Sequence, residues 1–266
     1  MSITAFKNII VAECADGQKK AGVDEGGLFI CKNLSISSDI VIDKRVFANI
    51  NATEENGYKI ISDILKYFHD FSSDTNRTVL IGGDHSLGIS SVDYYLNKYQ
   101  DKLKVLWIDA HADINDHITS LSGNLHGMPL GYHHISRTNN VCWRENPYKL
   151  NSSQLYYLGI RDLDPAETEL IQNQNIGFSN SFDNKLKDFI DSSEFLLISF
   201  DVDALDPSYV DSTGCLAPNG LSPSDVKSVI DYTIQTNKII HLDIMEFNPL
   251  LGNPEKSIEA LKTIFL

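Results

Sequence analysis

The sequence is poor in cysteine and in basic residues, and it contains no long apolar run. The four cysteines show no CxxC spacing and lie at Cys14, Cys31, Cys142 and Cys215. We therefore expect free thiols in a reducing compartment rather than disulfides or a zinc site. No stretch of 18 or more apolar residues is present, so no transmembrane helix is expected. The N-terminal segment lacks a basic stretch followed by a long apolar one, so we expect no secretory signal and a cytoplasmic protein.

Positive charge is also scarce. The chain has 22 lysines and arginines against 36 acidic residues, a formal net charge of −14. This balance argues against nucleic acid or an anionic membrane as the main partner. With 266 residues, of which 42% are hydrophobic, the chain can bury a large core. We expect one domain over residues 1–266, because no linker, repeat or low-complexity segment divides it.

Short apolar runs alternate with helical patterns along the chain. The predicted strands are 7–13, 77–82, 103–109, 155–160, 195–201 and 238–244, and the predicted helices are 52–71, 86–100, 182–192, 222–236 and 254–265. Ser222-Pro223 and Asn253-Pro254 each read as a helix N-cap followed by proline at the first helical position. Strands that alternate with helices predict an α/β protein with a parallel sheet covered on both faces.

Polar residues follow four of these strands at the point where each strand ends. In WIDAHAD, Asp109, His111 and Asp113 occupy alternate positions after a buried run, so they face one side of an extended chain. Crowded carboxylates there would repel each other. The other strand-end residues are His85, Asp201, Asp203 and Glu246. Because α/β sheets bind ligands at the carboxyl ends of their strands, we expect these side chains to form one site.

The strand-end residues are typical of a metal site. The candidate ligands are His85, Asp109, His111, Asp113, Asp201 and Asp203. Oxygen-rich ligation with some imidazole favours Mn²⁺ or a related divalent ion, and four aspartates balance the charge of two such ions. A single Asp-x-Asp is more often a turn or a helix cap, but three such clusters at strand ends favour ligation. The remaining histidines show no such pattern and are interpreted as surface or packing residues: His69, His117, His133, His134 and His241.

Four motifs resemble the arginase/agmatinase (ureohydrolase) family over nearly the whole chain: GGDHS (82–86), DAHAD (109–113), SFDVDALDP (199–207) and DIMEFNP (243–249). The resemblance implies a three-layer α/β/α sandwich around a parallel sheet of about eight strands, with two Mn²⁺ per chain. It assigns one ion to His85, Asp109, Asp113 and Asp201, and the other to His111, Asp109, Asp201 and Asp203. It also implies a homo-oligomer, a trimer or a hexamer.

Within the family, the chain resembles arginases in the segments that would bind the amino-acid end of the substrate. The resemblance assigns the α-carboxylate to Asn115 and Ser122, with Ser120 and Asn124 acting directly or through water. It assigns the α-amino group to Asp164 and Glu167, while Asp162 would support the loop and Thr213 would lie near the guanidinium. L-Arginine would then be hydrolysed to L-ornithine and urea.

The implied mechanism uses a hydroxide that bridges the two metal ions and is oriented by Asp113. The hydroxide attacks the guanidinium carbon while Glu246 pairs with the guanidinium, and His126 carries a proton to the leaving amine.

The chain departs from the arginase pattern at Cys215-Leu216, where arginases have Thr-Pro, and at Asp116, which adds a charge beside the expected carboxylate pocket. Two alternatives therefore stay open. An agmatinase or another guanidino-compound hydrolase would share the metal centre without the amino-acid contacts. The second alternative is a non-catalytic module that binds arginine or a metal. The intact ligand set and His126 argue against this alternative. Zinc deacetylases of a related fold have a different ligand pattern.

Overall fold

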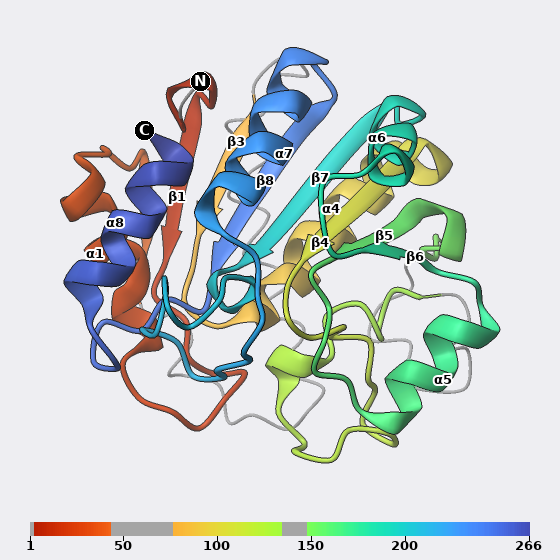
Figure 1. Ribbon diagram of the computed structural model, residues 1–266, viewed down its shortest axis with the longest axis horizontal. Coiled ribbons are helices and arrows are strands. Elements are labelled where there is room, and N and C mark those ends of the chain that lie inside the picture. The colour runs from red at the N-terminus through yellow and green to blue at the C-terminus, as the bar shows by residue number, and fades with distance from the viewer. Residues whose placement is uncertain (1–2, 44–76, 135–147) are drawn as a thin grey trace.

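The computed structural model describes residues 3–43, 77–134 and 148–266. Its central element is a parallel sheet of eight strands (Figure 1). The strands are β1 (Asn8–Ala12), β2 (Ile40–Ile42), β3 (Thr78–Ile81), β4 (Leu103–Ile108), β5 (Leu155–Leu158), β6 (Gly177–Ser179), β7 (Phe195–Asp201) and β8 (Ile239–Met245). Their order is β2-β1-β3-β8-β7-β4-β5-β6, and every pairing is parallel. The predicted fold class is confirmed.

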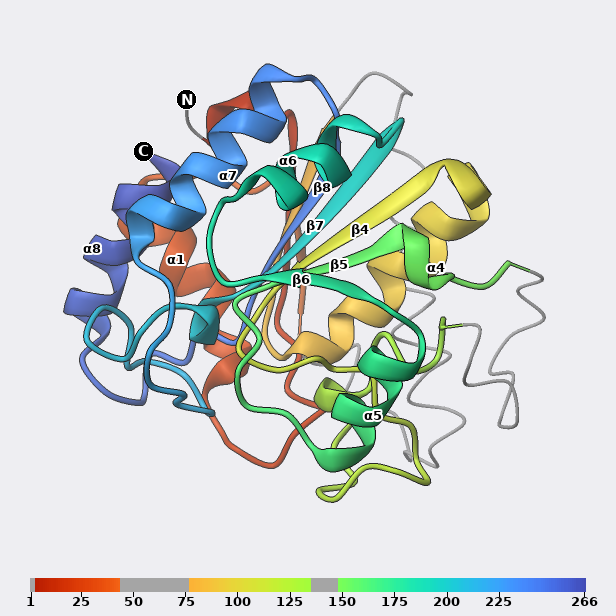
Figure 2. The same cartoon turned by 45° about the vertical axis from the view of Figure 1, so that its right-hand side comes forward.

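Helices cover both faces of the sheet. They are α1 (Gly26–Leu34), α4 (Gly88–Tyr99), α5 (Pro165–Asn173), α6 (Asn184–Asp191), α7 (Pro223–Gln235) and α8 (Pro254–Phe265). Figure 2 shows α1, α7 and α8 on one side of the strands and α4 on the other. The buried residues of α1, α6, α7 and α8 pack into one hydrophobic cluster, whereas those of α4 and α5 pack into another. Two cores on two faces of one sheet make the three-layer sandwich.

The strands and helices that were predicted within the described residues are present, with bounds shifted by a residue or two. The inner strands β4 and β7 are buried almost throughout, as expected where helices cover both faces. Both predicted N-caps are confirmed, since Ser222 Oγ accepts from the Asp225 N–H and Asn253 Oδ1 from the Lys256 N–H. The predicted helix 52–71 lies outside the described residues.

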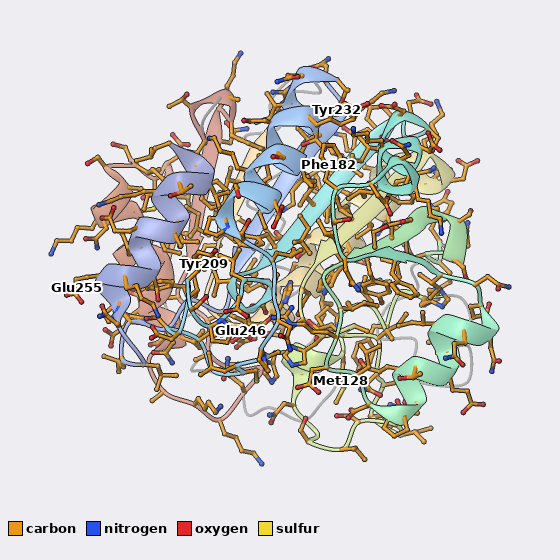
Figure 3. All side chains as sticks on the ribbon, in the orientation of Figure 1. Met128, Phe182, Tyr209, Tyr232, Glu246 and Glu255 are labelled. Carbon is orange, nitrogen blue, oxygen red and sulfur yellow. The ribbon has the colours of Figure 1, made fainter. Side chains whose placement is uncertain are left out.

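The order of the strands in the sheet determines where the site lies. β3, β8, β7 and β4 are consecutive neighbours, so their carboxyl ends meet at one edge of the sheet. Figure 3 shows Glu246, which directly follows β8, near the lower ends of the central strands. No helix among the described residues is long and apolar enough to cross a bilayer.

Candidate metal centre and substrate cavity

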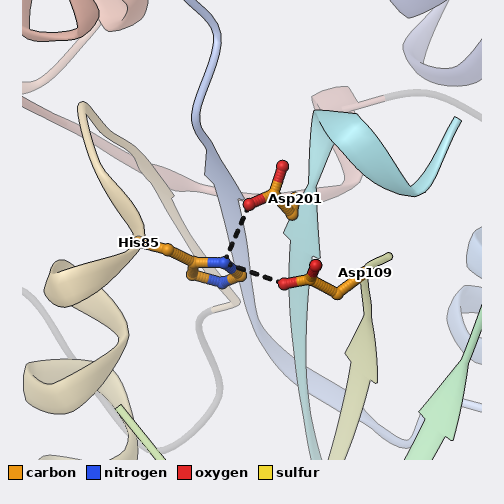
Figure 4. Close-up of side chains that lie close together, drawn as sticks. All are labelled: His85, Asp109 and Asp201. Carbon is orange, nitrogen blue, oxygen red and sulfur yellow. Dashed lines mark hydrogen bonds and ion pairs between the residues drawn. The ribbon is translucent and has the colours of Figure 1, made fainter. Parts of the chain in front are cut away.

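His85 lies at the centre of the acidic cluster. It begins a short 3-10 turn after β3, and Asp84 caps this turn by accepting from the Ser86 N–H at 2.9 Å. The Nδ1 atom of His85 lies 3.1 Å from Asp109 Oδ2 and 3.1 Å from Asp201 Oδ2, and Figure 4 shows both contacts. Asp113 Oδ2 lies 3.2 Å from the same nitrogen. Three carboxylates from the ends of β4 and β7 therefore converge on one ring nitrogen.

A second group forms around His111. Its Nδ1 atom lies 3.1 Å from Asp203 Oδ2 and 3.4 Å from Asp109 Oδ1. Two sets of residues can each hold an ion, namely His85, Asp109 and Asp201, and Asp109, His111 and Asp203. Asp109 belongs to both sets, so it can bridge them. The structure thus brings together all six predicted ligands.

The acids of the cluster differ in their electrostatics. Burial raises the pKa of Asp201 well above its usual range, and the charges of Asp203 and Asp109 add to this. Burial and the charge of Asp109 likewise raise the pKa of Asp203 to about 6. Burial alone would raise the pKa of Asp109, but the hydrogen bonds and positive charge of His111 and His85 lower it. Buried carboxylates that oppose each other's ionisation fit a site that divalent cations complete.

Two of the site residues have left-handed backbone conformations. Asp113 has a φ of 51° and Glu246 a φ of 66°, a region that residues other than glycine rarely adopt. Backbone hydrogen bonds hold both residues in place, because the Asp113 carbonyl accepts from Leu130 and the Glu246 N–H donates to Gly83. Such strain is typical of sites where a side chain must point in one direction.

Glu246 is held by three donors. Its Oε1 atom accepts from the His85 N–H and from His126 Nδ1, each at 2.9 Å. Its Oε2 atom accepts from Gln18 Nε2 at 2.6 Å. Burial disfavours the charged form of His126, but the hydrogen bond and charge of Glu246 outweigh it and raise the pKa of His126 to about 9. Burial likewise opposes the charge on Glu246, but His126 lowers the pKa of this carboxyl.

Gln18 is a site residue that was not predicted from the sequence. It lies on the loop 15–21, whose backbone contacts the site twice: the Gly17 N–H donates to Asp84 Oδ2, and the Gly17 carbonyl accepts from His126. The segment DGQKK has no strand-end pattern. Only the folded arrangement brings it to Glu246.

A cavity of about 280 Å³ adjoins the cluster. Residues of the acidic cluster and its neighbours line it: His111, Asp113, Asp201, Asp203, His126 and Glu246. The residues predicted to bind the amino-acid end also line it: Asn115, Ser120, Ser122, Asn124, Asp164 and Glu167. Four of the candidate metal ligands and the predicted amino-acid contacts therefore line one cavity.

At one side of the cavity, polar side chains also contact each other. Asn115 Nδ2 donates to Asp164 Oδ2 at 2.9 Å. Glu167 accepts from the backbone N–H groups of Ile114 and Asp164, so it supports the loop as well as lining the cavity. Burial raises the pKa of Glu167 to about 7.

Some residues singled out in the sequence lie at the edge of the cavity or outside it. Thr213 is buried and does not line the cavity, whereas Cys215 does. Asp162 lines the cavity and lies 3.7 Å from His111 Nε2. Asp116 accepts from the N–H groups of Ile118 and Thr119 and does not line the cavity, so its charge stabilises its own turn.

The remaining histidines and cysteines agree with the prediction as far as the structure describes them. His133, His134 and His241 are buried, and His117 is exposed. Free thiols are present at Cys14, Cys31 and Cys215. His69 and Cys142 lie outside the described residues.

The fold and the site together define a class, a parallel α/β protein with a candidate metal centre at the carboxyl ends of its strands. The family model described as "Arginase family" matches residues 12–266. The chain is 30% identical to an arginase of Eremothecium gossypii, over 92% of this chain and 70% of that protein. It is 28% identical to Arginase-1 of Mus musculus, over 95% of this chain and 87% of that protein.

The chain also resembles an arginase of known structure. The arginase of Entamoeba histolytica in complex with L-ornithine superposes with a TM-score of 0.78 at 27% identity, over 97% of both chains. The chain belongs to the arginase family and is a ureohydrolase. The family resemblance seen in the four motifs is confirmed.

Proposed function

We propose that the chain hydrolyses L-arginine to L-ornithine and urea, with two Mn²⁺ ions per chain. The observation that carries the proposal is a cavity that adjoins two candidate ion-binding sets, which share Asp109, and that is also lined by polar residues suited to an amino acid. The Entamoeba histolytica arginase, which has the same fold, was solved with L-ornithine bound.

The family resemblance assigns the metal ligands, and the two groups of side chains around His85 and His111 support this assignment. His85, Asp109, Asp113 and Asp201 would hold one ion, and His111, Asp109, Asp201 and Asp203 the other. Oxygen-rich sites with imidazole favour Mn²⁺ over metals that prefer thiolate, and the carboxylates balance the charge of two divalent ions. Two such ions, when bound, lower the pKa of a water molecule so that it can act as a nucleophile at neutral pH.

The chain's own residues would position the substrate and move its proton. Glu246 keeps its charge in the interior because His126 lowers its pKa, so it can pair with a guanidinium at the cavity floor. Asp113, aimed by its left-handed backbone, can accept a hydrogen bond from the attacking water. His126 has a pKa of about 9 and therefore carries a proton at neutral pH, which it can donate to the leaving amine.

The other side of the cavity would bind the α-carbon groups of arginine. Ser122 and Asn115, with Ser120 and Asn124 nearby, offer donors to the α-carboxylate, while Asp164 and Glu167 offer charge to the α-amino group. Asn115 Oδ1 is buried and has no partner within the described residues. A buried acceptor without a partner is costly, so it supports a ligand that brings a donor here, which the α-ammonium group of arginine has and its carboxylate has not. The Thr213 hydroxyl is also buried without a partner within the described residues, but Thr213 does not line the cavity, so its place near the guanidinium stays a prediction.

We further infer that residues 1–266 form one domain, that the protein is a cytoplasmic homo-oligomer, and that it acts on a small molecule rather than on nucleic acid or a membrane. The sheet supports the first point, because it joins strands from residue 8 to residue 245. The net charge of −14 supports the last. The family resemblance favours a trimer or a hexamer.

The test is urea release from L-arginine, agmatine and 4-guanidinobutyrate by protein loaded with Mn²⁺. We expect arginine to have by far the highest kcat/KM, because agmatine lacks the carboxylate and would leave buried donors unpaired, at about 1–3 kcal/mol each. Equal or faster hydrolysis of agmatine would overturn the arginase assignment in favour of an agmatinase. Arginine binding without urea release would favour a non-catalytic module.

A further inference from the structure

A second set of polar side chains lies behind His85, on the side away from the three carboxylates. The Nε2 atom of His85 lies 2.9 Å from Ser199 Oγ, and Ser199 Oγ donates to Asp243 Oδ2, also at 2.9 Å. Ser199 on β7 and Asp243 on β8 are register partners, so the sheet fixes their separation. All three residues are completely buried. A continuous chain of hydrogen bonds therefore leads from His85 into the middle of the sheet.

The direction of these hydrogen bonds sets the tautomer of His85. The Ser199 hydroxyl has one proton, which it gives to the Asp243 carboxylate, so toward His85 it can only accept. The Nε2 atom of His85 must therefore carry a hydrogen. In a neutral imidazole the lone pair is then on Nδ1, the atom that faces the three carboxylates. This is the tautomer that a metal ligand at Nδ1 requires.

The ring plane of His85 is fixed as well. His85 stacks on Trp107, with ring centroids 4.3 Å apart and an angle of 10° between the planes. The Trp107 indole also donates to Asp109 Oδ2 at 3.0 Å, so one side chain orients two candidate ligands. The stacking on Trp107 and the contact with Ser199 together restrict the His85 ring to one orientation.

Asp243 is in turn held by further donors. Its Oδ1 atom accepts from Ser91 Oγ on α4 and contacts His241 Nε2, each at 2.7 Å. The His241 ring also packs against Tyr95, at 4.8 Å between centroids. A carboxylate in the centre of a sheet is expensive to bury, and a well-packed apolar side chain would serve stability as well or better. The network therefore points to a role other than stability.

We propose that Ser199, Asp243 and His241 are positioning residues that hold His85 in the tautomer and orientation needed to bind a metal ion. Hydrogen bonds of this kind raise the basicity of a histidine ligand and reduce the entropy lost on binding. The inference rests on the metal-binding part of the proposed function and not on the substrate. It gives His241, expected from the sequence only to pack, a place in the site.

The test is the affinity of the metal-free protein for Mn²⁺, measured by calorimetric titration for Ser199→Ala, Asp243→Asn and the double variant. We expect each single variant to bind the ion that His85 holds about 10- to 100-fold more weakly. Because both changes interrupt one chain of hydrogen bonds, the double variant should bind no more weakly than the worse single variant. The ¹⁵N–¹H spectrum of His85 in the metal-free protein should also show that the Nε2–H signal shifts in Ser199→Ala and not in Ser193→Ala, because the hydrogen bond to Ser199 is lost.

Ser193→Ala is the matched control, because Ser193 is a buried serine just before β7 whose hydroxyl donates to the Ile190 carbonyl. It should bind Mn²⁺ as the wild type does. The proposal would be overturned if Ser199→Ala bound Mn²⁺ with wild-type affinity, or lost no more affinity than Ser193→Ala does. This outcome can be read even if Asp243→Asn does not fold. Wild-type protein that binds no Mn²⁺ would overturn both proposals, whereas tight binding without urea release from arginine would contradict only the proposed function.

Discussion

The individual carboxylates of this site suit different roles because their surroundings differ. Asp201 lies among other acids, and burial with their charges raises its pKa, so a cation is its natural partner. Glu246 lies among donors, and its contacts with His126, Gln18 and the His85 N–H keep it charged. The first environment suits a metal ligand, and the second suits a partner for an organic cation.

His126 gives a pH dependence that can be measured. Its pKa rises from 6.5 to about 9 in the folded protein, and its side chain is only 17% exposed. Below pH 6.5 the imidazole is protonated in both states, so its full contribution to stability, on the order of 3 kcal/mol, is present. As the pH rises through about 9 the folded state loses this proton, and the contribution disappears.

We therefore expect metal-free wild type to exceed His126→Asn in free energy of unfolding at pH 6 and to lose most of this difference by pH 10. Denaturant unfolding at several pH values measures it. A difference that stays constant over this range would show that the His126–Glu246 pair does not set the pKa.

At the scale of elements, the loop 15–21 depends on close packing against the turn at His85. A Cβ atom on Gly17 would lie 2.2 Å from Asp84 Oδ1 and 2.7 Å from the Ser86 Cβ. The loop can therefore approach the capped turn at His85 only with glycine at this position. Its close approach brings Gln18 to Glu246.

Gly17→Ala should destabilise the protein by about 1–3 kcal/mol, as overpacking does, and should lower urea release because Gln18 moves away from Glu246. Gly127→Ala is the control for stability, because a Cβ there meets nothing within 4 Å. Thermal unfolding of the two variants compares them directly. Equal melting temperatures would mean that the loop tolerates displacement.

Some strands and site residues could be predicted from the sequence, and others could not. Strands such as β4 and β7 are long apolar runs and were predictable from that pattern alone. The strands β2 and β6 have three residues each at the sheet edges, too few for a periodic signal. The strand-end ligands were visible because acids after buried runs are unusual. Gln18 was not, since its contact with Glu246 joins residues 228 positions apart.

At the scale of the whole molecule, the strand order creates the site. The chain order of β3, β4, β7 and β8 could be read from the sequence, but their spatial order, β3-β8-β7-β4, could not. This order places Asp201, the last residue of β7, between the strand that precedes His85 and the strand that precedes Asp109. The same order buries Ser199 and Asp243 behind His85, where neither gives a pattern in the sequence.

In the proposed site, residues from the ends of adjacent strands hold two metal ions, whereas Glu246 holds the substrate. The most direct measurement is the number of Mn²⁺ ions per chain, by native mass spectrometry, in wild type, Asp201→Ala and Glu246→Gln. We expect two ions in wild type, at most one in Asp201→Ala with nearly all turnover lost, and two in Glu246→Gln. Urea release by Glu246→Gln should fall by about thirtyfold to several thousandfold in kcat/KM, because truncating one partner of a buried charge pair costs roughly 2–5 kcal/mol. Two ions and retained activity in Asp201→Ala would rule out the proposed metal centre.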